Sequence, residues 1–276
     1  MRVGVGYPRQ AMADTGQVNS SAAEFYDAFF LPALFEEWAP RMVAAAGLRP
    51  SMKVLDVACG TGVLTERAGE AVLPGGKVVG VDLNPGMLAV ARRKRGPIEW
   101  REAPAESLPY DAGTFDVVMS QFGLMFFTDQ PRAIAEMWKV LRPGGRLVVA
   151  VWDTLENTPG YHAVTRILSR LFGEGIADLL RSPYSLGDSN RLQALFTEAG
   201  VGSVKVRREP GTARFPSIRG WMECDVRGWT LADELDDDQF EQLVSEAERE
   251  LRPFVTVDRT VEFSHPALIV TAEKPA

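Results

Sequence analysis

The chain has 276 residues, of which 46% are hydrophobic and 24% charged, and its formal net charge is −7. This length and composition suit one large α/β domain with a buried core and exclude a globally disordered chain. The acidic balance argues against a duplex-binding protein and against a protein that binds anionic membranes, because both normally present a basic face.

Cysteine usage and the lack of long apolar runs bear on the compartment. The cysteines are Cys59 and Cys224, and neither belongs to a Cys-x-x-Cys pair or a Cys/His cluster, so no disulfide framework and no metal site are predicted. Residues 1–16 lack the apolar core of a signal peptide, and the longest apolar run, 147–152, is too short to span a bilayer. We therefore expect a cytoplasmic protein without an integral membrane segment.

The N-terminal region reads as an arm followed by a lid. Residues 1–20 are aperiodic and are expected to form a flexible arm. Residues 23–47 place aromatic residues at helical spacing, and Pro32 and Pro40 are expected to divide them into two or three short helices. These helices, within 21–50, are expected to form the lid.

From residue 53 the sequence alternates apolar strands with helices. Strands are predicted at 53–58, 77–82, 98–102, 115–120 and 146–152, and helices at 63–72, 85–94 and 131–141. This alternation predicts a parallel sheet covered by helices on both faces. The fold class is therefore α/β, and residues 51–152 are expected to form its ligand-binding core.

The second half of the chain has a looser pattern. Helices are predicted at 161–172 and 188–200, a strand at 203–209, further helices between 214 and 252, and a strand pair or long edge strand at 259–275. Residues 153–276 are thus expected to complete the core, with helical cap insertions at about 153–190 and 214–256.

The segment "ACGTG" at 58–62 carries the first sign of a ligand. Gly60 and Gly62 lie where a strand turns into a helix, so a ligand can approach the backbone closely and meet the free N–H groups of the helix. Asp82 follows twenty residues after Gly62, at the end of the next strand, where a carboxylate can accept hydrogen bonds from both ribose hydroxyls. Together these residues predict an adenosine-containing ligand.

Two residues near the turn discriminate between adenosine-containing ligands. A dinucleotide site needs a third glycine where this chain has Thr65, and it seldom carries an acid within the turn. Asp56 would repel a pyrophosphate but favour the ammonium and sulfonium groups of S-adenosyl-L-methionine (SAM). The charge pattern therefore favours SAM, and a nicotinamide-dependent oxidoreductase is the rival interpretation.

Five sequence motifs, in an order and spacing typical of one enzyme family, strengthen this interpretation. They are "VLDVACGTGVLTERA", "VVGVDLNPGMLAVAR", "APAESLPY", "FDVVMSQFGLMFFTD" and "AIAEMWKVLRPGGRLVVAVW". Over residues 24–152 the chain resembles the class I SAM-dependent methyltransferases, most of all the branch related to ubiquinone and menaquinone biosynthesis methyltransferases. The resemblance implies a Rossmann-like seven-stranded sheet in the order 3214576 with strand 7 antiparallel. Residues 203–209 would supply strand 6, and the C-terminal segment would supply strand 7.

The resemblance also implies roles for residues of a cofactor site. It implies that the methionine moiety is lined by Asp56, Ala58, Gly60 and Gly62, and that the ribose hydroxyls are bound by Asp82. It implies that Leu83 and Met87 pack on the adenine, while Ala105 and Glu106 contact the adenine edge. The ammonium group would be bound by the backbone carbonyl of Gln121, beside Phe122. One departure is Pro104, where the family commonly has an acid for the adenine amino group. Another is "FGLMFF" in place of "FGLRN", which counts against a quinone acceptor.

The methyl acceptor is less well defined by the sequence. Methyl transfer from a sulfonium depends on alignment and a dry site, so a base is not indispensable; His162 is the candidate. The residues expected around the acceptor are Tyr26, Phe29, Met125, Phe126, Trp152, Tyr184 and Trp221. They suit an apolar small molecule, such as an aromatic or isoprenoid-like secondary metabolite, methylated at carbon or oxygen.

Two further interpretations stay open. A protein that holds SAM without turnover is compatible with the sequence, because no indispensable catalytic side chain is evident. A nucleic-acid methyltransferase is opposed by the acidic charge and by "SQFG" at 120–123, where such enzymes usually carry an Asn/Asp-Pro-Pro-aromatic sequence. We expect a small-molecule partner, no nucleic acid, and a monomer or homodimer.

Overall fold

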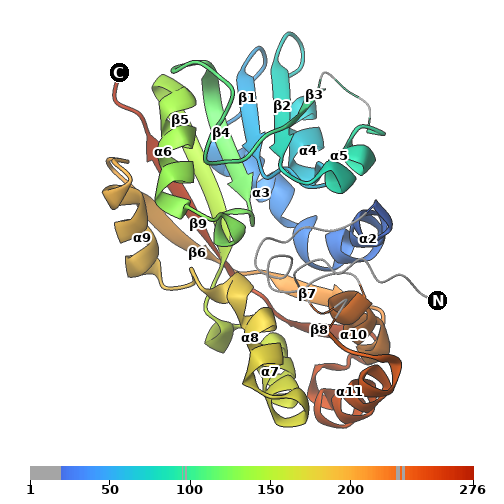
Figure 1. Cartoon of the computed structure of the whole chain (residues 1–276). Coiled ribbons are helices and arrows are strands. Elements are labelled where there is room, and N and C mark those ends of the chain that lie inside the picture. The colour runs from blue at the N-terminus through green and yellow to red at the C-terminus, as the bar shows by residue number, and fades with distance from the viewer. Residues whose placement is uncertain (1–19, 95, 97, 228–230, 232–233) are drawn as a thin grey trace, which may run out of the picture.

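The alternating strands and helices fold into a central sheet with a cap beyond one of its ends (Figure 1). The computed structural model describes residues 20–276 except 95, 97, 228–230 and 232–233. The arm expected at 1–20 therefore lies, apart from Ser20, outside the described residues.

The central sheet has seven strands in the order β3-β2-β1-β4-β5-β9-β6. The strands are β1 (Lys53–Val57), β2 (Lys77–Asp82), β3 (Ile98–Glu102), β4 (Phe115–Gln121), β5 (Leu141–Trp152), β6 (Lys205–Glu209) and β9 (Ala267–Glu273). Neighbouring strands from β3 to β5 run parallel, whereas β9 runs antiparallel to both β5 and β6. This arrangement confirms the predicted order 3214576 with an antiparallel seventh strand.

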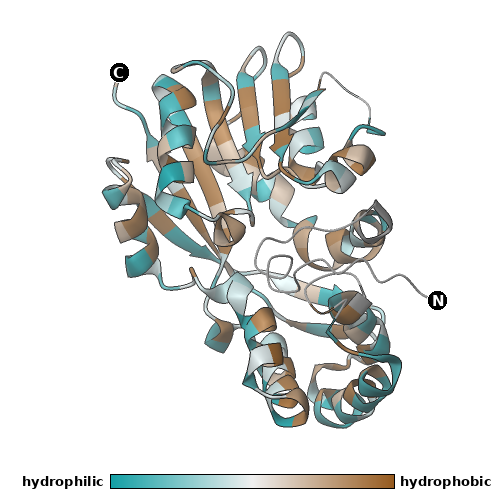
Figure 2. Ribbon diagram, in the orientation of Figure 1, coloured by the Kyte–Doolittle hydropathy of each residue, from teal (hydrophilic) through white to brown (hydrophobic). Residues whose placement is uncertain are grey.

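Helices cover both faces of this sheet. On one face lie α3 (Trp38–Ala46) and α4 (Val63–Ala71), which pack against each other, and on the other lie α6 (Gln130–Val140) and α9 (Ser189–Glu198). Figure 2 shows that the strands between them are mostly hydrophobic, as expected where both faces of a parallel sheet are buried.

The helix α5 (Pro85–Ala91) begins where the sequence dictates. Asn84 caps it, because its side-chain oxygen accepts from the backbone N–H groups of Gly86 at 2.8 Å and Met87 at 3.2 Å. Pro85 occupies the first turn, where its missing N–H costs nothing. The cap fixes the direction in which the chain leaves the end of β2.

The N-terminal helices do not break where the prolines predicted. They are α2 (Ser20–Phe25), the π-helix η1 (Tyr26–Phe35) and α3. Pro32 lies inside η1, whose wider turn accommodates the ring, and Pro40 lies in the first turn of α3, where proline is tolerated. The break falls instead at residues 36–37.

Ion pairs hold these helices against the core. Arg93 pairs with Glu24 at 2.7 Å, and Lys94 pairs with Asp27 at 3.4 Å. Both cations follow α5, so the pairs link α2 and the start of η1 to the segment after that helix. In Figure 1, α2 accordingly lies next to α5.

The C-terminal segment 259–275 is neither a strand pair nor an edge strand. Its first part, β8 (Val261–Ser264), pairs with β7 (Thr212–Phe215) in a separate two-stranded sheet. Its second part, β9, is an interior strand of the central sheet. The chain changes sheets at Pro266, which lacks the N–H that a continuous ladder would need. The strand β7 was also not predicted, because residues from 214 onward were expected to be helical.

The cap lies beyond the carboxyl ends of the parallel strands (Figure 1). Besides β7 and β8 it contains α7 (Pro159–Phe172), α8 (Glu174–Arg181), α10 (Ile218–Arg227) and α11 (Asp237–Glu250), with the short helices η3 (Leu155–Asn157), η4 (Ser182–Tyr184) and η5 (Arg252–Phe254). Among the described residues, none of the helices combines the length and the apolar character needed to cross a bilayer.

Candidate functional site

A cleft opens at the carboxyl ends of β1, β2 and β4, beneath the π-helix η1. It is lined by Tyr26, Phe35, Ala58, Gly60, Asp82, Leu83, Asn84, Met87, Ala103, Ala105, Glu106, Gln121, Phe122, Gly123, Phe126, Phe127 and Thr128. Ligands of open α/β sheets bind in this position, outside the carboxyl ends of the strands. The cleft therefore brings together most of the residues that the sequence assigned to a cofactor.

The backbone is strained at the ends of β1 and β4. Ala58 and Phe122 have φ angles of 57° and 56°, a left-handed conformation that residues other than glycine seldom adopt. The two ends lie so close that a Cβ on Gly123 would sit 2.5 Å from the Cβ of Ala58. Strain of this kind persists only where the surrounding structure enforces it, and it is common in binding sites.

Asp82 joins two loops at the cleft. One carboxylate oxygen accepts from the N–H of Gly60 at 2.8 Å, and the other accepts from the N–H of Asn84 at 2.8 Å. Burial raises the pKa of Asp82, while these backbone N–H groups and that of Leu83 act to lower it. Each oxygen can accept a further hydrogen bond, so the carboxylate can also bind the hydroxyls of a ribose.

Asp56 lies beneath the glycine turn and outside the residues that line the cleft. Its side chain is 1% exposed, and one oxygen accepts from the Thr65 hydroxyl at 2.6 Å. The other oxygen has no hydrogen-bond partner among the described residues. Burial, and to a lesser extent the charge of Asp82, raises the pKa of Asp56 to about 7, against the opposing effect of Thr65. A buried acceptor without a partner fits a cationic ligand.

The two glycines of the turn do different things. Gly60 lines the cleft at a φ of +56°, and a Cβ there would meet no protein atom within 4 Å. Gly62 does not line the cleft, and a Cβ there would lie 2.4 Å from the indole of Trp100 on β3. Gly62 thus permits close packing between α4 and the sheet, whereas Gly60 leaves space for a ligand.

Four residues that the resemblance assigned to the adenine are brought to the cleft. Leu83, Met87, Ala105 and Glu106 all line it, and Leu83 is 51% exposed although it is apolar. The Glu106 carboxylate accepts from the N–H of Thr128 at 2.9 Å through one oxygen, so it also orders the turn before α6.

Comparisons with known proteins agree with this geometry. A family described as "Methyltransferase domain" matches residues 55–149. The ubiquinone/menaquinone biosynthesis C-methyltransferase UbiE of Cronobacter sakazakii is 36% identical over 184 residues, which cover 60% of this chain and 73% of that protein. The demethylmenaquinone methyltransferase of Lactococcus lactis is 31% identical over 192 residues, covering 64% and 76%. The chain belongs to the class I SAM-dependent methyltransferases.

Two solved structures share the fold of this chain. The phosphoethanolamine N-methyltransferase 2 of Haemonchus contortus, in complex with SAM, superposes with a TM-score of 0.63 at 17% identity, covering 99% of this chain and 61% of that one. The YcgJ protein of Bacillus subtilis gives a TM-score of 0.58 at 17% identity, covering 87% and 99%. The family membership decides against the nicotinamide-dependent rival, and the cofactor of this methyltransferase is SAM.

The residues predicted around the acceptor separate into two layers. Tyr26 and Phe126 line the cleft of the methyltransferase, whereas Phe29 is 50% exposed and does not. Burial, followed by the charges of Asp82 and Asp27, raises the pKa of Tyr26, so its hydroxyl stays protonated. Tyr26 can therefore donate a hydrogen bond but is a poor base.

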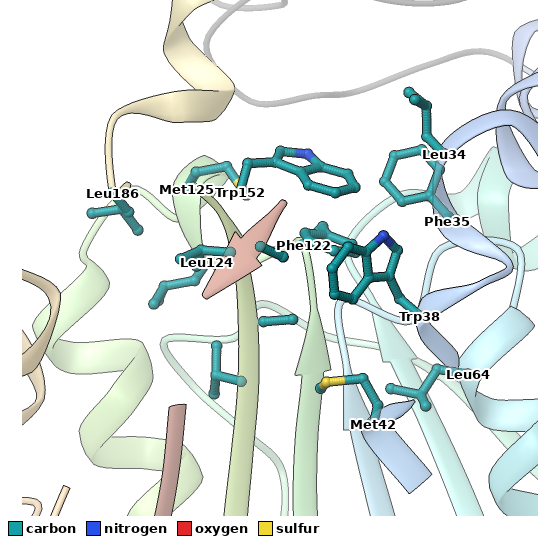
Figure 3. Packing of buried hydrophobic residues seen from close by; sticks show 14 of the residues in the cluster. Leu34, Phe35, Trp38, Met42, Leu64, Phe122, Leu124, Met125, Trp152 and Leu186 are labelled. Carbon is teal, nitrogen blue, oxygen red and sulfur yellow. The ribbon is translucent and has the colours of Figure 1, made fainter. Parts of the chain in front are cut away.

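Four of the predicted acceptor residues are buried and do not line the cleft. Trp152 is buried and stacks on Phe122, with 3.6 Å between the ring centroids (Figure 3). Tyr184 and Trp221 are buried deeper in the cap, and Met125 is buried without lining the cleft. His162 is exposed on α7 and does not line the cleft either.

Several residues that line the cleft were not assigned to it from the sequence. These are Phe35, Asn84, Ala103, Gly123, Phe127 and Thr128. The Asn84-Pro85 pair is a helix-start signal that could have placed Asn84 at the end of β2. Phe35 carries no such signal, because the π-helical turn shifts it relative to α-helical spacing.

A substitution at Gly60 tests whether the turn contacts the cofactor. We expect Gly60→Val to abolish binding of S-adenosylhomocysteine (SAH), because the new side chain would enter the cleft. The matched control is Gly200→Val: Gly200 also has a positive φ, +84°, with no atom within 4 Å of a Cβ, but lies at the end of α9. Both variants carry the cost of a left-handed residue, about 1–2 kcal/mol. Isothermal titration with SAH should separate them, and equal affinities in the two variants would show that Gly60 does not contact the cofactor.

Proposed function

We propose that this methyltransferase transfers the methyl group of SAM to a carbon or oxygen of an apolar small molecule. The observation that carries the proposal is the aromatic lining of the cleft. Besides the Asp82 carboxylate and bare backbone, the cleft is lined by the rings of Tyr26, Phe35, Phe122, Phe126 and Phe127. Such a wall offers apolar surface and few ionised groups.

The assignment of cofactor contacts is part of the same proposal. Asp82 binds the ribose hydroxyls, Leu83 and Met87 pack on the adenine, and the backbone near Gly60 faces the methionine moiety. Asp56 attracts the ammonium group, directly or through a water molecule, and its unpartnered buried oxygen supports this role. When bound, SAM supplies an electrophilic methyl group. The chain's contribution is to orient it and to keep the cleft dry.

The proposed class of methyl acceptor rests on the aromatic lining of the cleft and on the names of the relatives. The relatives reported above are named for ubiquinone and menaquinone biosynthesis, and their identity to this chain is modest. The "FGLMFF" segment departs from the ubiquinone type, so we propose an aromatic or isoprenoid-like acceptor of wider class. We further propose that residues 51–152 bind the cofactor, that 21–50 form a lid, and that 153–276 complete the core and carry cap insertions at about 153–190 and 214–256.

The acceptor class can be tested with methyl-labelled SAM and a lysate of the source cells. We expect the label to enter the fraction that organic solvent extracts, and Asp82→Ala should abolish the transfer. Label that enters acid-precipitable protein or nucleic acid instead would contradict a small-molecule acceptor. An enzyme that binds SAH but labels no fraction would support a protein that holds SAM without turnover.

Asp82→Ala should weaken SAH binding by about 2–4 kcal/mol, through the loss of two charge-assisted hydrogen bonds. Thermal unfolding without SAH shows how much of the change comes from the lost bonds to Gly60 and Asn84. Asp258→Ala serves as a control, because Asp258 is exposed in the loop before β8. An affinity within twofold of the unaltered chain would remove Asp82 from the cofactor site.

The affinity for SAH should rise between pH 5.5 and 8. The pKa of Asp56 in the free protein is raised to about 7, and the ammonium group of the ligand favours the ionised carboxylate. Binding below pH 7 must therefore release a proton, and this cost disappears once Asp56 is already ionised. Titration in buffers of different ionisation enthalpy measures that release. Asp56→Asn should bind weakly at every pH with no proton release; an unaltered pH dependence in that variant would contradict the assignment.

A further inference from the structure

A set of stacked rings connects the wall of the cleft with the cap. Phe122 lines the cleft, and the Trp152 indole stacks on it at 3.6 Å with 12° between the planes. The His265 imidazole stacks on Trp152 at 4.0 Å and 25°. These three rings, here called the stacked rings, come from the end of β4, the end of β5 and the connection between β8 and β9.

The stacked rings are fastened at the cap by a hydrogen bond. The Tyr184 hydroxyl in η4 lies 3.0 Å from Nε2 of His265, and both side chains are buried, at 8% and 1% exposure. Burial lowers the pKa of His265 to about 3 and raises that of Tyr184 well above its ordinary value. Both side chains are therefore neutral at physiological pH, and His265 is a poor base.

Phe122, at the other end of the stacked rings, has a strained backbone that depends on the packing around it. Phe122 has a left-handed φ of 56°, and its N–H donates to the carbonyl of Ala150 at 2.9 Å. Its ring also meets Phe35 and Trp38 edge-on, each at 5.7 Å, so it is enclosed on several sides (Figure 3). A phenylalanine released from this enclosure would relax toward an ordinary φ and shift the wall of the cleft.

We propose that Tyr184 and His265 are a positioning pair for methyl transfer. Their hydrogen bond fixes the His265 ring, which holds Trp152 flat against Phe122 and so fixes the aromatic lining of the cleft. Neither residue lines the cleft, so both act through Trp152. The inference rests on the proposed function and adds the residues that set its geometry.

A purely apolar packing role predicts something different. Phenylalanine at position 265 could still stack on Trp152, so packing alone would be preserved in His265→Phe. Positioning requires the hydrogen bond as well. Tyr184→Phe and His265→Phe should therefore have the same effect, and the double variant should be no worse than either single variant.

The test follows Trp152 directly in protein labelled with 5-fluorotryptophan. The fluorine resonance of Trp152 is identified by its loss in Trp152→Phe, and spectra are recorded with SAH bound. We expect one sharp line in the unaltered chain and a broadened or split line in Tyr184→Phe, His265→Phe and the double variant. Label transfer from SAM into the organic-solvent fraction should fall about tenfold in all three, as small misplacements of reacting groups do. The dissociation constant of SAH should change by less than twofold.

Tyr161→Phe is the matched control. It removes another buried tyrosine hydroxyl of the cap, which donates to Asp225 at 3.1 Å, but keeps the ring beside His265. It should lower the melting temperature and leave the Trp152 line and the transfer rate unchanged.

The outcomes separate the inference from the proposed function. An unchanged Trp152 line and transfer rate in the Tyr184 and His265 variants would overturn the positioning pair while leaving the function intact. A loss of SAH affinity in step with the melting temperature, shared by Tyr161→Phe, would also overturn it, because the role would then be structural. Failure of the unaltered chain to bind SAH would contradict the proposed function itself.

Discussion

The whole site depends on one carboxylate that holds two loops together. Asp82 stands at the end of β2 and accepts one backbone N–H from the turn after β1 and one from the start of α5. Without it, two backbone donors at the edge of the cleft would lose their partners. The same oxygens face the cleft in which we expect the ribose to lie. The carboxylate that orders the cleft is therefore also the one that we expect to bind the ribose hydroxyls.

A second buried carboxylate is the proposed source of the site's charge preference. Asp56 lies under the turn with one oxygen held by Thr65 and the other without a partner among the described residues. Burial, and to a lesser extent the charge of Asp82, raises the pKa of Asp56. An anionic phosphate would add a like charge nearby, whereas an ammonium group would favour the ionised carboxylate. Local electrostatics and family membership therefore lead to the same cofactor by independent routes.

Much of this architecture could be predicted from the sequence, because its signals are local. The βα alternation from residue 53 gave the sheet, and the positions of Gly60 and Asp82 at strand ends placed them in the cleft. Gly62 was assigned to the ligand, yet the structure sets it against Trp100, which lies 38 residues further along the chain. A single sequence does not distinguish a glycine that leaves space for a ligand from one that leaves space for an indole ring.

The parts that escaped prediction depend on distant pairing. The sequence of β8 and β9 shows one nearly continuous strand pattern, but β8 pairs with β7 and β9 pairs with strands of the central sheet. Trp152 and Tyr184 were expected to touch the acceptor because they are aromatic and near the strand ends. The structure puts Trp152 directly behind Phe122 and Tyr184 deeper still, behind His265, since apolar character indicates burial without indicating depth.

The most direct test of the central claim is a crystal structure of the chain with SAH. We expect both ribose hydroxyls within hydrogen-bond distance of the Asp82 carboxylate and the amino group on the Asp56 side of the glycine turn. A ribose bound away from Asp82, or SAH held outside the cleft, would contradict it.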